Sequence, residues 1–159
     1  MSDKIMTAAQ LEPVLKHARA QKKRIVFTNG CFDLMHIGHT RYLQAARALG
    51  DLLVVGVNSD ASVRSLNKGS DRPIVPETQR AEVLAALGCV DYVVIFSEPD
   101  PGALIAALQP DVLVKGGDWA INQIVGRETV EARGGIVTTI PLVPGMSTTS
   151  LLQRIRSTT

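Results

Sequence analysis

Short apolar runs alternate along the chain with segments in which apolar residues recur at helical spacing. The runs are rich in β-branched residues and lack the polar alternation of a half-exposed strand, which is typical of strands buried on both faces. They predict five strands, at 24–28, 52–57, 92–96, 112–114 and 136–140. The segments between and around them predict helices at 7–23, 38–49, 78–87, 101–108 and 150–156.

Strands that alternate with helices predict a parallel sheet whose faces are both covered by helices. We therefore expect an α/β fold with a Rossmann-like parallel five-stranded sheet. Residues 1–159 would form a single domain, with an N-terminal helical extension at 1–23 and a catalytic core at 24–156. Ligands of such sheets bind beyond the carboxyl ends of the strands, so the segments that follow each strand are the ones to examine for chemistry.

The composition excludes several classes of protein. No apolar run approaches the roughly 20 residues of a membrane span. Cys31 and Cys89 are the only cysteines, which rules out a disulfide scaffold and a multi-cysteine zinc site. We expect a cytoplasmic protein without a membrane partner.

The charge of the chain is small but unevenly distributed. A net charge of +2 and 4% aromatic residues argue against nucleic acid as a partner. Residues 1–80 carry 12 Lys and Arg against 7 Asp and Glu, a net charge of +5, and residues 81–159 carry 5 against 8, a net charge of −3. The asymmetry suggests that the first half handles a polyanion, although a solvated basic face is the simpler interpretation.

The segment that follows the first predicted strand, 28–39, contains the most informative motif. Gly30 permits a tight turn, and His36 and His39 lie three residues apart at a helix start, where free N–H groups attract anions. This favours a phosphate site over a capped helix with two partly buried histidines. Neither a P-loop nor a Gly-x-Gly-x-x-Gly fingerprint is present. A metal would need a third ligand, for which Asp33 is the only close candidate, so we expect no metal bound by protein side chains.

Phe32-Asp33 followed by His36-Ile37-Gly38-His39 resembles the signature of the HIGH-motif nucleotidyltransferases, the cytidylyltransferase-like superfamily. The resemblance covers about 24–156 and continues through Val57-Asn58-Ser59-Asp60, Lys68-Gly69-Ser70-Asp71-Arg72-Pro73, Arg80, Val114-Lys115-Gly116-Gly117-Asp118-Trp119 and Gly145-Met146-Ser147-Thr148-Thr149. The whole set is most similar to the branch that forms ADP-heptose from ATP and D-glycero-β-D-manno-heptose 1-phosphate. In many bacteria that domain follows a sugar kinase domain, so the chain resembles the stand-alone form.

This resemblance implies that an oxygen of the sugar phosphate attacks the α-phosphorus of ATP and that pyrophosphate leaves. It implies Mg²⁺ bound mainly through the ATP phosphates, and a homodimer. It assigns catalysis to His36, His39, Lys68 and Lys115. It assigns nucleotide binding to these two histidines and Lys115 together with Thr28, Asn29, Gly30, Cys31, Phe32, Gly38, Arg80, Gly116, Gly117, Asp118, Ser147, Thr148 and Thr149. It assigns binding of the sugar phosphate to Asp33, Asn58, Asp60, Lys68 and Arg72.

Structural roles remain open for several of these residues. Lys68 could be an exposed loop lysine, and Arg72 could shape its loop. Arg80 lies near a helix start, where a bare cation is unfavourable. It therefore needs an anionic partner, either on a ligand or from Glu77 or Glu82. Asp60 and the hydroxyls of 147–149 could equally cap helices.

Two departures favour ATP over CTP. The glycerol-phosphate cytidylyltransferase branch often has an arginine and a threonine where Leu142 and Val143 stand, and an acidic residue at the place of Gly117. A CTP-dependent cytidylyltransferase acting on glycerol 3-phosphate or a related alcohol phosphate remains the alternative enzyme. A nucleotide-binding regulator without catalysis is the alternative from another class, and an assembly module is the least favoured.

Overall fold

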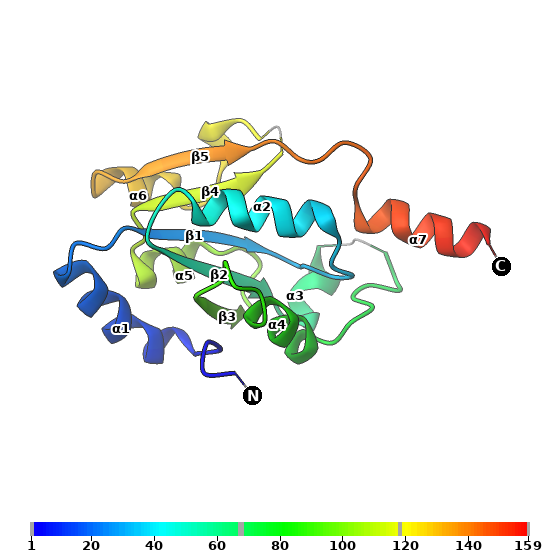
Figure 1. Cartoon of the computed structure of the whole chain (residues 1–159), viewed down its shortest axis with the longest axis horizontal. Helices are drawn as coiled ribbons and strands as arrows, with labels where there is room; N and C mark the ends of the chain where they lie inside the picture. Colours follow the sequence, from blue (N-terminus) through cyan, green and yellow to red (C-terminus); the bar gives the residue numbers. More distant parts are fainter. Residues whose placement is uncertain (1, 67–68, 118, 159) are drawn as a thin grey trace.

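The computed structural model describes residues 2–66, 69–117 and 119–158 (Figure 1). Within them, a single parallel sheet has the strand order β3-β2-β1-β4-β5. The strands are β1 (Ile25–Gly30), β2 (Leu52–Asn58), β3 (Tyr92–Phe96), β4 (Val112–Gly116) and β5 (Ile136–Ile140). The predicted five-stranded Rossmann-like sheet is therefore confirmed, and its strand order reverses between β1 and β4.

The helices fall close to where apolar periodicity placed them. They are α1 (Ala8–Ala20), α2 (Ile37–Arg47), α3 (Asp60–Ser65), α4 (Glu77–Ala85), α5 (Gly102–Leu108), α6 (Arg127–Ala132) and α7 (Thr148–Ser157), with a 3-10 turn η1 (Ile121–Gln123). The sequence did not predict α3 and α6. Each has six residues, which is too short for a 3.6-residue period to become visible.

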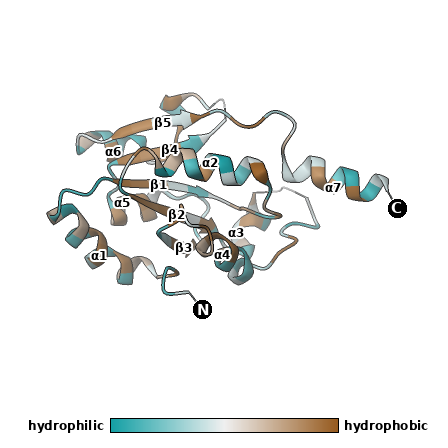
Figure 2. Ribbon diagram, viewed as in Figure 1, coloured by the Kyte–Doolittle hydropathy of each residue, from teal (hydrophilic) through white to brown (hydrophobic). Residues whose placement is uncertain are grey.

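Helices cover both faces of the sheet, as expected, and each face has its own core (Figure 2). On one face, α2 and α4 pack through Leu43, Ala46, Ala81 and Leu84 against strand residues such as Val55. On the other face, α1, α5 and α6 pack through Leu11, Leu15, Ile105, Leu108 and Val130. Strands β1, β2 and β4 are buried along most of their length, whereas the edge strand β5 is largely half-exposed.

The N-terminal segment is packed onto the sheet. Thr7 caps α1 and forms a capping box with Gln10, and Leu11 and Leu15 are fully buried. Before the helix, Ile5 pairs with Val93 at the edge of β3. The predicted extension at 1–23 thus contributes to both cores, with Leu11 and Leu15 in one and Ile5 packed against the other.

Helix α7 lies beyond the carboxyl ends of the strands, at the right of Figure 1. None of its residues is fully buried. Within the described ranges, the Thr148 hydroxyl donates to the carbonyl oxygen of Asp33 at 2.7 Å, and Arg156 forms an ion pair with Asp71. Among the described residues, no helix combines the length and the apolar character needed to cross a bilayer.

Candidate active site

A crevice opens where the strand order reverses. β1 pairs with β2 over all six of its residues. Both β1 and β4 are described along their whole length, yet the ladder between them holds only Val26–Val112 and Phe27–Leu113. Beyond these pairs lies a pocket of about 540 Å³, lined by Asn29, Gly30, Cys31, Phe32, Asp33, His36, Gly38, His39, Tyr42, Arg72, Lys115, Gly116, Leu142, Val143, Met146, Ser147, Thr148 and Thr149. Most of the predicted site residues therefore gather in one place, as ligand binding at a switch point requires.

His36 and His39 form the first turn of α2 together. His36 is the N-cap, and its Nδ1 accepts from the backbone N–H of Gly38 at 3.1 Å. The Nδ1 of His39 accepts from the backbone N–H of His36 at 3.3 Å, and the ring centroids lie 3.9 Å apart. Because each Nδ1 accepts a hydrogen bond, the proton of each neutral ring sits on Nε2. Burial lowers the pKa of His36, which favours this neutral donor form. The capped helix and the phosphate site are therefore compatible.

The backbone around these histidines is shaped by close contacts. A Cβ at Gly38 would lie 2.8 Å from Cε1 and Nδ1 of His36, so only glycine lets that ring fold over the helix start. Phe32 and Leu34 adopt left-handed backbone angles, with φ of 52° and 49°; such strain is common at functional loops. The buried Phe32 ring packs 5.5 Å from that of His39. Phe32, predicted to bind nucleotide, thus supports His39 from the core.

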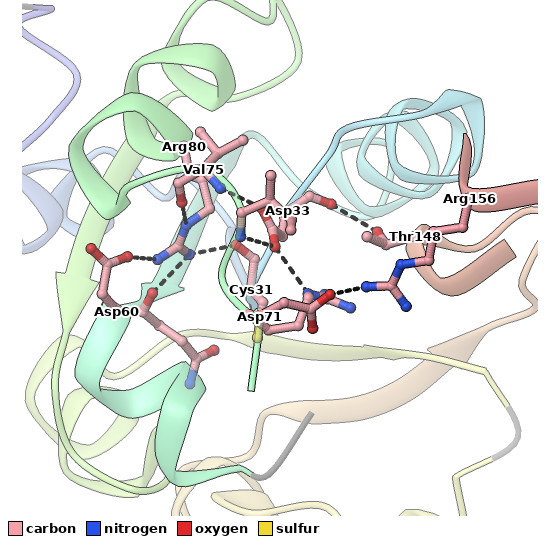
Figure 3. Close-up of polar contacts among 11 residues, drawn as sticks. Cys31, Asp33, Asp60, Asp71, Val75, Arg80, Thr148 and Arg156 are labelled. Carbon is pink, nitrogen blue, oxygen red and sulfur yellow. Dashed lines mark hydrogen bonds and ion pairs between the residues drawn. The ribbon is translucent and has the colours of Figure 1, made fainter. Parts of the chain in front are cut away.

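Asp33 has a different role from the one predicted. The residue is 1% exposed, and its carboxylate accepts from Arg72 Nε at 3.0 Å and from the backbone N–H groups of Ile74 and Val75 at 2.8 and 2.9 Å (Figure 3). These donors are all protein groups. Asp33 therefore holds the 72–75 loop against the segment that follows β1, and its carboxylate is engaged by the protein rather than directed at a sugar phosphate.

Arg80 also turns inward, away from the pocket. Its side chain is 1% exposed and donates to the carbonyl oxygens of Val75, Cys31 and Asn58 at 2.6–2.8 Å, and to Asp60 at 2.8 Å (Figure 3). This corrects the predicted contact with nucleotide, because the contacts of this guanidinium join three loops of the protein.

The anionic partner of Arg80 is Asp60, not the predicted Glu77 or Glu82. The carboxylate of Glu77 instead accepts from the backbone N–H of Asp60 at 3.0 Å. Asn58, also predicted to bind substrate, is 4% exposed and donates to Ser62 Oγ at 2.9 Å. Asn58 ends β2 and Asp60 begins α3, and both are absent from the lining of the described pocket.

The start of α7 and the end of β4 close the pocket on two sides. Ser147 caps α7 by accepting from Ser150 N–H at 3.0 Å, so the capping role left open by the sequence is present, and the first residues of the helix also line the pocket. Lys115 lies at the end of β4 with its Nζ 5.4 Å from the centre of the Trp119 ring. Gly117 makes the following turn, with a φ of 93°. Lys68 and Asp118 lie outside the described residues.

Sequence reasoning missed the apolar wall of the pocket and one polar residue, Tyr42. The wall comprises Leu142, Val143 and Met146. Tyr42 follows His39 by one helical turn and so shares the face of that histidine. Its hydroxyl meets the Thr28 hydroxyl at 2.6 Å. The fully buried Thr28 side chain, predicted to bind nucleotide, is engaged there instead.

The uneven charge of the chain does not mark the site. Arg19, Lys22, Lys23 and Arg24 line a hollow with Arg133 at the amino ends of the strands, opposite the pocket. Arg19 donates to the carbonyl oxygens of Leu108 and Gln109 at the end of α5, where a cation is favourable. The basic excess of the first half is therefore largely a structural and solvated feature.

The sequence is similar to a known family and to longer curated proteins. A family model described as cytidylyltransferase-like matches residues 27–158. The bifunctional protein HldE of Geotalea uraniireducens (strain Rf4) is 55% identical over 154 residues, covering 97% of this chain and 31% of that protein. HldE of Citrifermentans bemidjiense is 58% identical over 148 residues, covering 91% of this chain and 30% of that protein. This chain thus spans about a third of the length of these relatives.

Two solved structures share the fold. The lipopolysaccharide core biosynthesis protein of Thermoplasma volcanium GSS1 superposes with a TM-score of 0.63 at 28% identity, covering 76% of this chain and 97% of that one. Pantoate-beta-alanine ligase of Francisella tularensis superposes with a TM-score of 0.58, covering 88% of this chain and 67% of that one. At 15% identity, the second likeness concerns the fold alone.

Proposed function

This chain belongs to the cytidylyltransferase-like family, and we propose that it transfers AMP from ATP to D-glycero-β-D-manno-heptose 1-phosphate, giving ADP-heptose and pyrophosphate. The enzyme class, a nucleotidyltransferase, is confirmed by this membership and by the HldE relatives. The observation that carries the proposal is the pocket at the strand-order reversal, where the two α2 histidines and the start of α7 face Lys115. The motif set supports the heptose acceptor, as does the role in lipopolysaccharide core biosynthesis named for the Thermoplasma neighbour.

The proposed reaction is one displacement at phosphorus. An oxygen of the sugar phosphate forms a bond to the α-phosphorus of ATP while the bond to the pyrophosphate oxygen breaks, so no proton or protein nucleophile is needed. The protein must align the two phosphates and stabilise the charge on the five-coordinate centre. The Nε2–H groups of His36 and His39, next to the free N–H groups of the α2 start, would donate to the phosphate oxygens.

Arg72 is the cation we assign to the sugar phosphate. It lines the pocket, and its Nε is fixed on the buried carboxylate of Asp33. That bond orients the planar guanidinium so that its terminal nitrogens can meet a phosphate. Lys115, across the crevice, would neutralise the triphosphate. Lys68 keeps its proposed role on the phosphates from the sequence resemblance alone.

Mg²⁺ would enter with the nucleotide. No group of three candidate metal-ligating side chains occurs in the described part of the chain, and Asp33, the carboxylate that lines the pocket, is already saturated by three donors. The described residues therefore do not form a protein site for a resident Mg²⁺ ion, and a metal carried by the triphosphate would keep oxygen ligands from ATP and water. A homodimer and a cytoplasmic setting are part of the same proposal.

Pyrophosphate release tests the proposal directly. The purified chain would be incubated with Mg²⁺ and either ATP or CTP, each with heptose 1-phosphate or glycerol 3-phosphate. We expect turnover with ATP and heptose 1-phosphate. Turnover with CTP and glycerol 3-phosphate instead would replace the proposal by the cytidylyltransferase alternative. ATP binding without turnover in any pairing would favour the regulator.

A further inference from the structure

Tyr42 reaches from α2 to the place where β1 and β4 stop pairing. Its hydroxyl donates to the carbonyl oxygen of Val114 on β4 at 3.2 Å. It lies 2.6 Å from the hydroxyl of Thr28 on β1. Since the single phenolic proton points to Val114, the Thr28 hydroxyl donates in the second contact. One side chain thus joins both strands immediately after their last paired residues, Phe27 and Leu113.

These two contacts connect β1 and β4 just beyond the last pair of the ladder between them. Thr28 and Val114 are both fully buried, so water does not serve their polar groups. A buried donor or acceptor without a partner is costly, and the Tyr42 hydroxyl supplies a partner to each. The Tyr42 hydroxyl therefore bridges β1 and β4 at the point where the ladder between them ends.

The Tyr42 ring also explains a glycine at the end of β4. A Cβ at Gly116 would lie 3.3 Å from Cε2 of Tyr42 and 3.2 Å from Cδ2 of Leu142. Both contacts are tighter than ordinary packing, so the Tyr42 ring packs directly against the backbone of Gly116. Both residues line the pocket.

We propose that Tyr42 is a positioning residue, whose hydroxyl sets the separation of the carboxyl ends of β1 and β4 and hence the spacing between the α2 histidines and Lys115. This rests on the proposed function, because that spacing matters where one ligand spans both strands. A misplacement of about 1 Å in such a site can lower a rate by as much as 10²-fold.

The same geometry excludes Tyr42 as an acid or base in the reaction. Both hydrogen bonds of its hydroxyl go to protein groups. Burial raises the pKa of Tyr42 to about 12, so the phenol keeps its proton at neutral pH. Its effect on catalysis must therefore pass through the strands.

Tyr42→Phe keeps the ring and removes the hydroxyl. We expect it to lower Tm by roughly 3–8 °C and kcat by about 10-fold or more, at a temperature where the variant is fully folded. Hydrogen exchange at the amides of Asn29 and Lys115 should accelerate. Tyr92→Phe is the matched control, since the described residues give the Tyr92 hydroxyl no hydrogen bond. It should leave Tm, exchange and kcat unchanged.

A double-mutant cycle with Thr28→Val tests the hydrogen bond between the Tyr42 and Thr28 hydroxyls without any substrate. The Thr28 hydroxyl loses its acceptor in Tyr42→Phe, so the double variant should have a Tm no lower than Tyr42→Phe alone. Additive losses of Tm, or a Tyr42→Phe variant whose kcat equals that of wild type, would overturn the proposal. If wild type turns over no substrate pair, the proposed function fails on that result alone, while the cycle and the exchange rates still decide the role of Tyr42.

Discussion

Polar residues at the two ends of the strands differ in their burial and in their bonding partners. At the carboxyl ends, Asp33 and Arg80 are each 1% exposed and bonded to protein groups from several loops. At the amino ends, Lys22, Lys23 and Arg24 are exposed to solvent around a hollow. The amino ends of the strands thus carry the exposed basic charge. The carboxyl ends have the strained loop, the buried ion pairs and the two histidines. Buried polar groups therefore coincide with the proposed active site, whereas exposed charge does not.

The contrast recurs within two consecutive residues of one loop. Arg72 pairs with Asp33, and the side chains are 8% and 0% exposed. Asp71 pairs with Arg156, and those side chains are 40% and 66% exposed. A buried pair that loses one partner leaves an uncompensated charge, whereas an exposed pair exchanges its partner for water.

Asp33→Ala should have the largest effect. It leaves Arg72 and two backbone N–H groups without an acceptor, so the free energy of unfolding should fall by about 3–5 kcal/mol. Urea denaturation monitored by circular dichroism measures the loss. Asp71→Ala is the control in the same loop and should change it by less than about 0.5 kcal/mol. An equal loss of unfolding free energy in the two variants would contradict the difference proposed between the buried and the exposed ion pair.

His39→Ala should act on the rate more than on the fold. Removal of one donor to the charge on the transferred phosphate should lower kcat by roughly 10²–10³-fold. Steady-state pyrophosphate release measures it, and a urea curve shows that the variant is folded. His17→Ala, on the exposed side of α1, should keep the wild-type kcat. Normal turnover of His39→Ala would refute the assigned role.

The stability contributed by His36 should depend weakly on pH. Burial lowers its pKa in the folded protein below the ordinary value of about 6.5, so below that value the unfolded chain binds more protons than the folded one. This contribution is present above pH 6.5 and is lost as the pH falls towards the folded pKa. His36→Asn keeps a capping side chain and removes the titration. The difference in unfolding free energy between wild type and His36→Asn should shift against wild type from pH 7 to pH 5, and a pH-independent difference would contradict the assignment.

Substitutions at the basic end should have the smallest effect. The Lys22→Gln, Lys23→Gln double variant removes two exposed charges from the hollow opposite the pocket. We expect the unfolding free energy to change by less than about 0.5 kcal/mol and kcat to stay at the wild-type value. A tenfold fall in kcat would show that the charges at the amino ends of the strands influence catalysis.

Local patterns along the chain were sufficient for most of the fold. The strands at 92–96 and 136–140 occur with the predicted bounds. The first is a continuous apolar and aromatic run between Asp91 and Ser97, and the second is a β-branched run bounded by Gly135 and Pro141. The helix start at His36 and His39 could likewise be predicted, since capping involves residues within three positions. Helices α3 and α6 could not, because tertiary contacts and not periodicity stabilise six residues as a helix.

The direction in which a polar side chain points was decided by tertiary structure. Asp33 and Arg72 are 39 residues apart in the chain, and Thr148 is 115 residues from the carbonyl group it contacts. Whether such a group faces a ligand or the protein depends on which donors, distant in the chain, pack beside it. Residue type and local spacing do not specify those donors. The sequence by itself thus determined the elements, their order and the residues that follow each strand. Folding decided that Asp33, Arg80 and Tyr42 hold the pocket in shape, because a buried polar group binds whichever partner packing brings within reach.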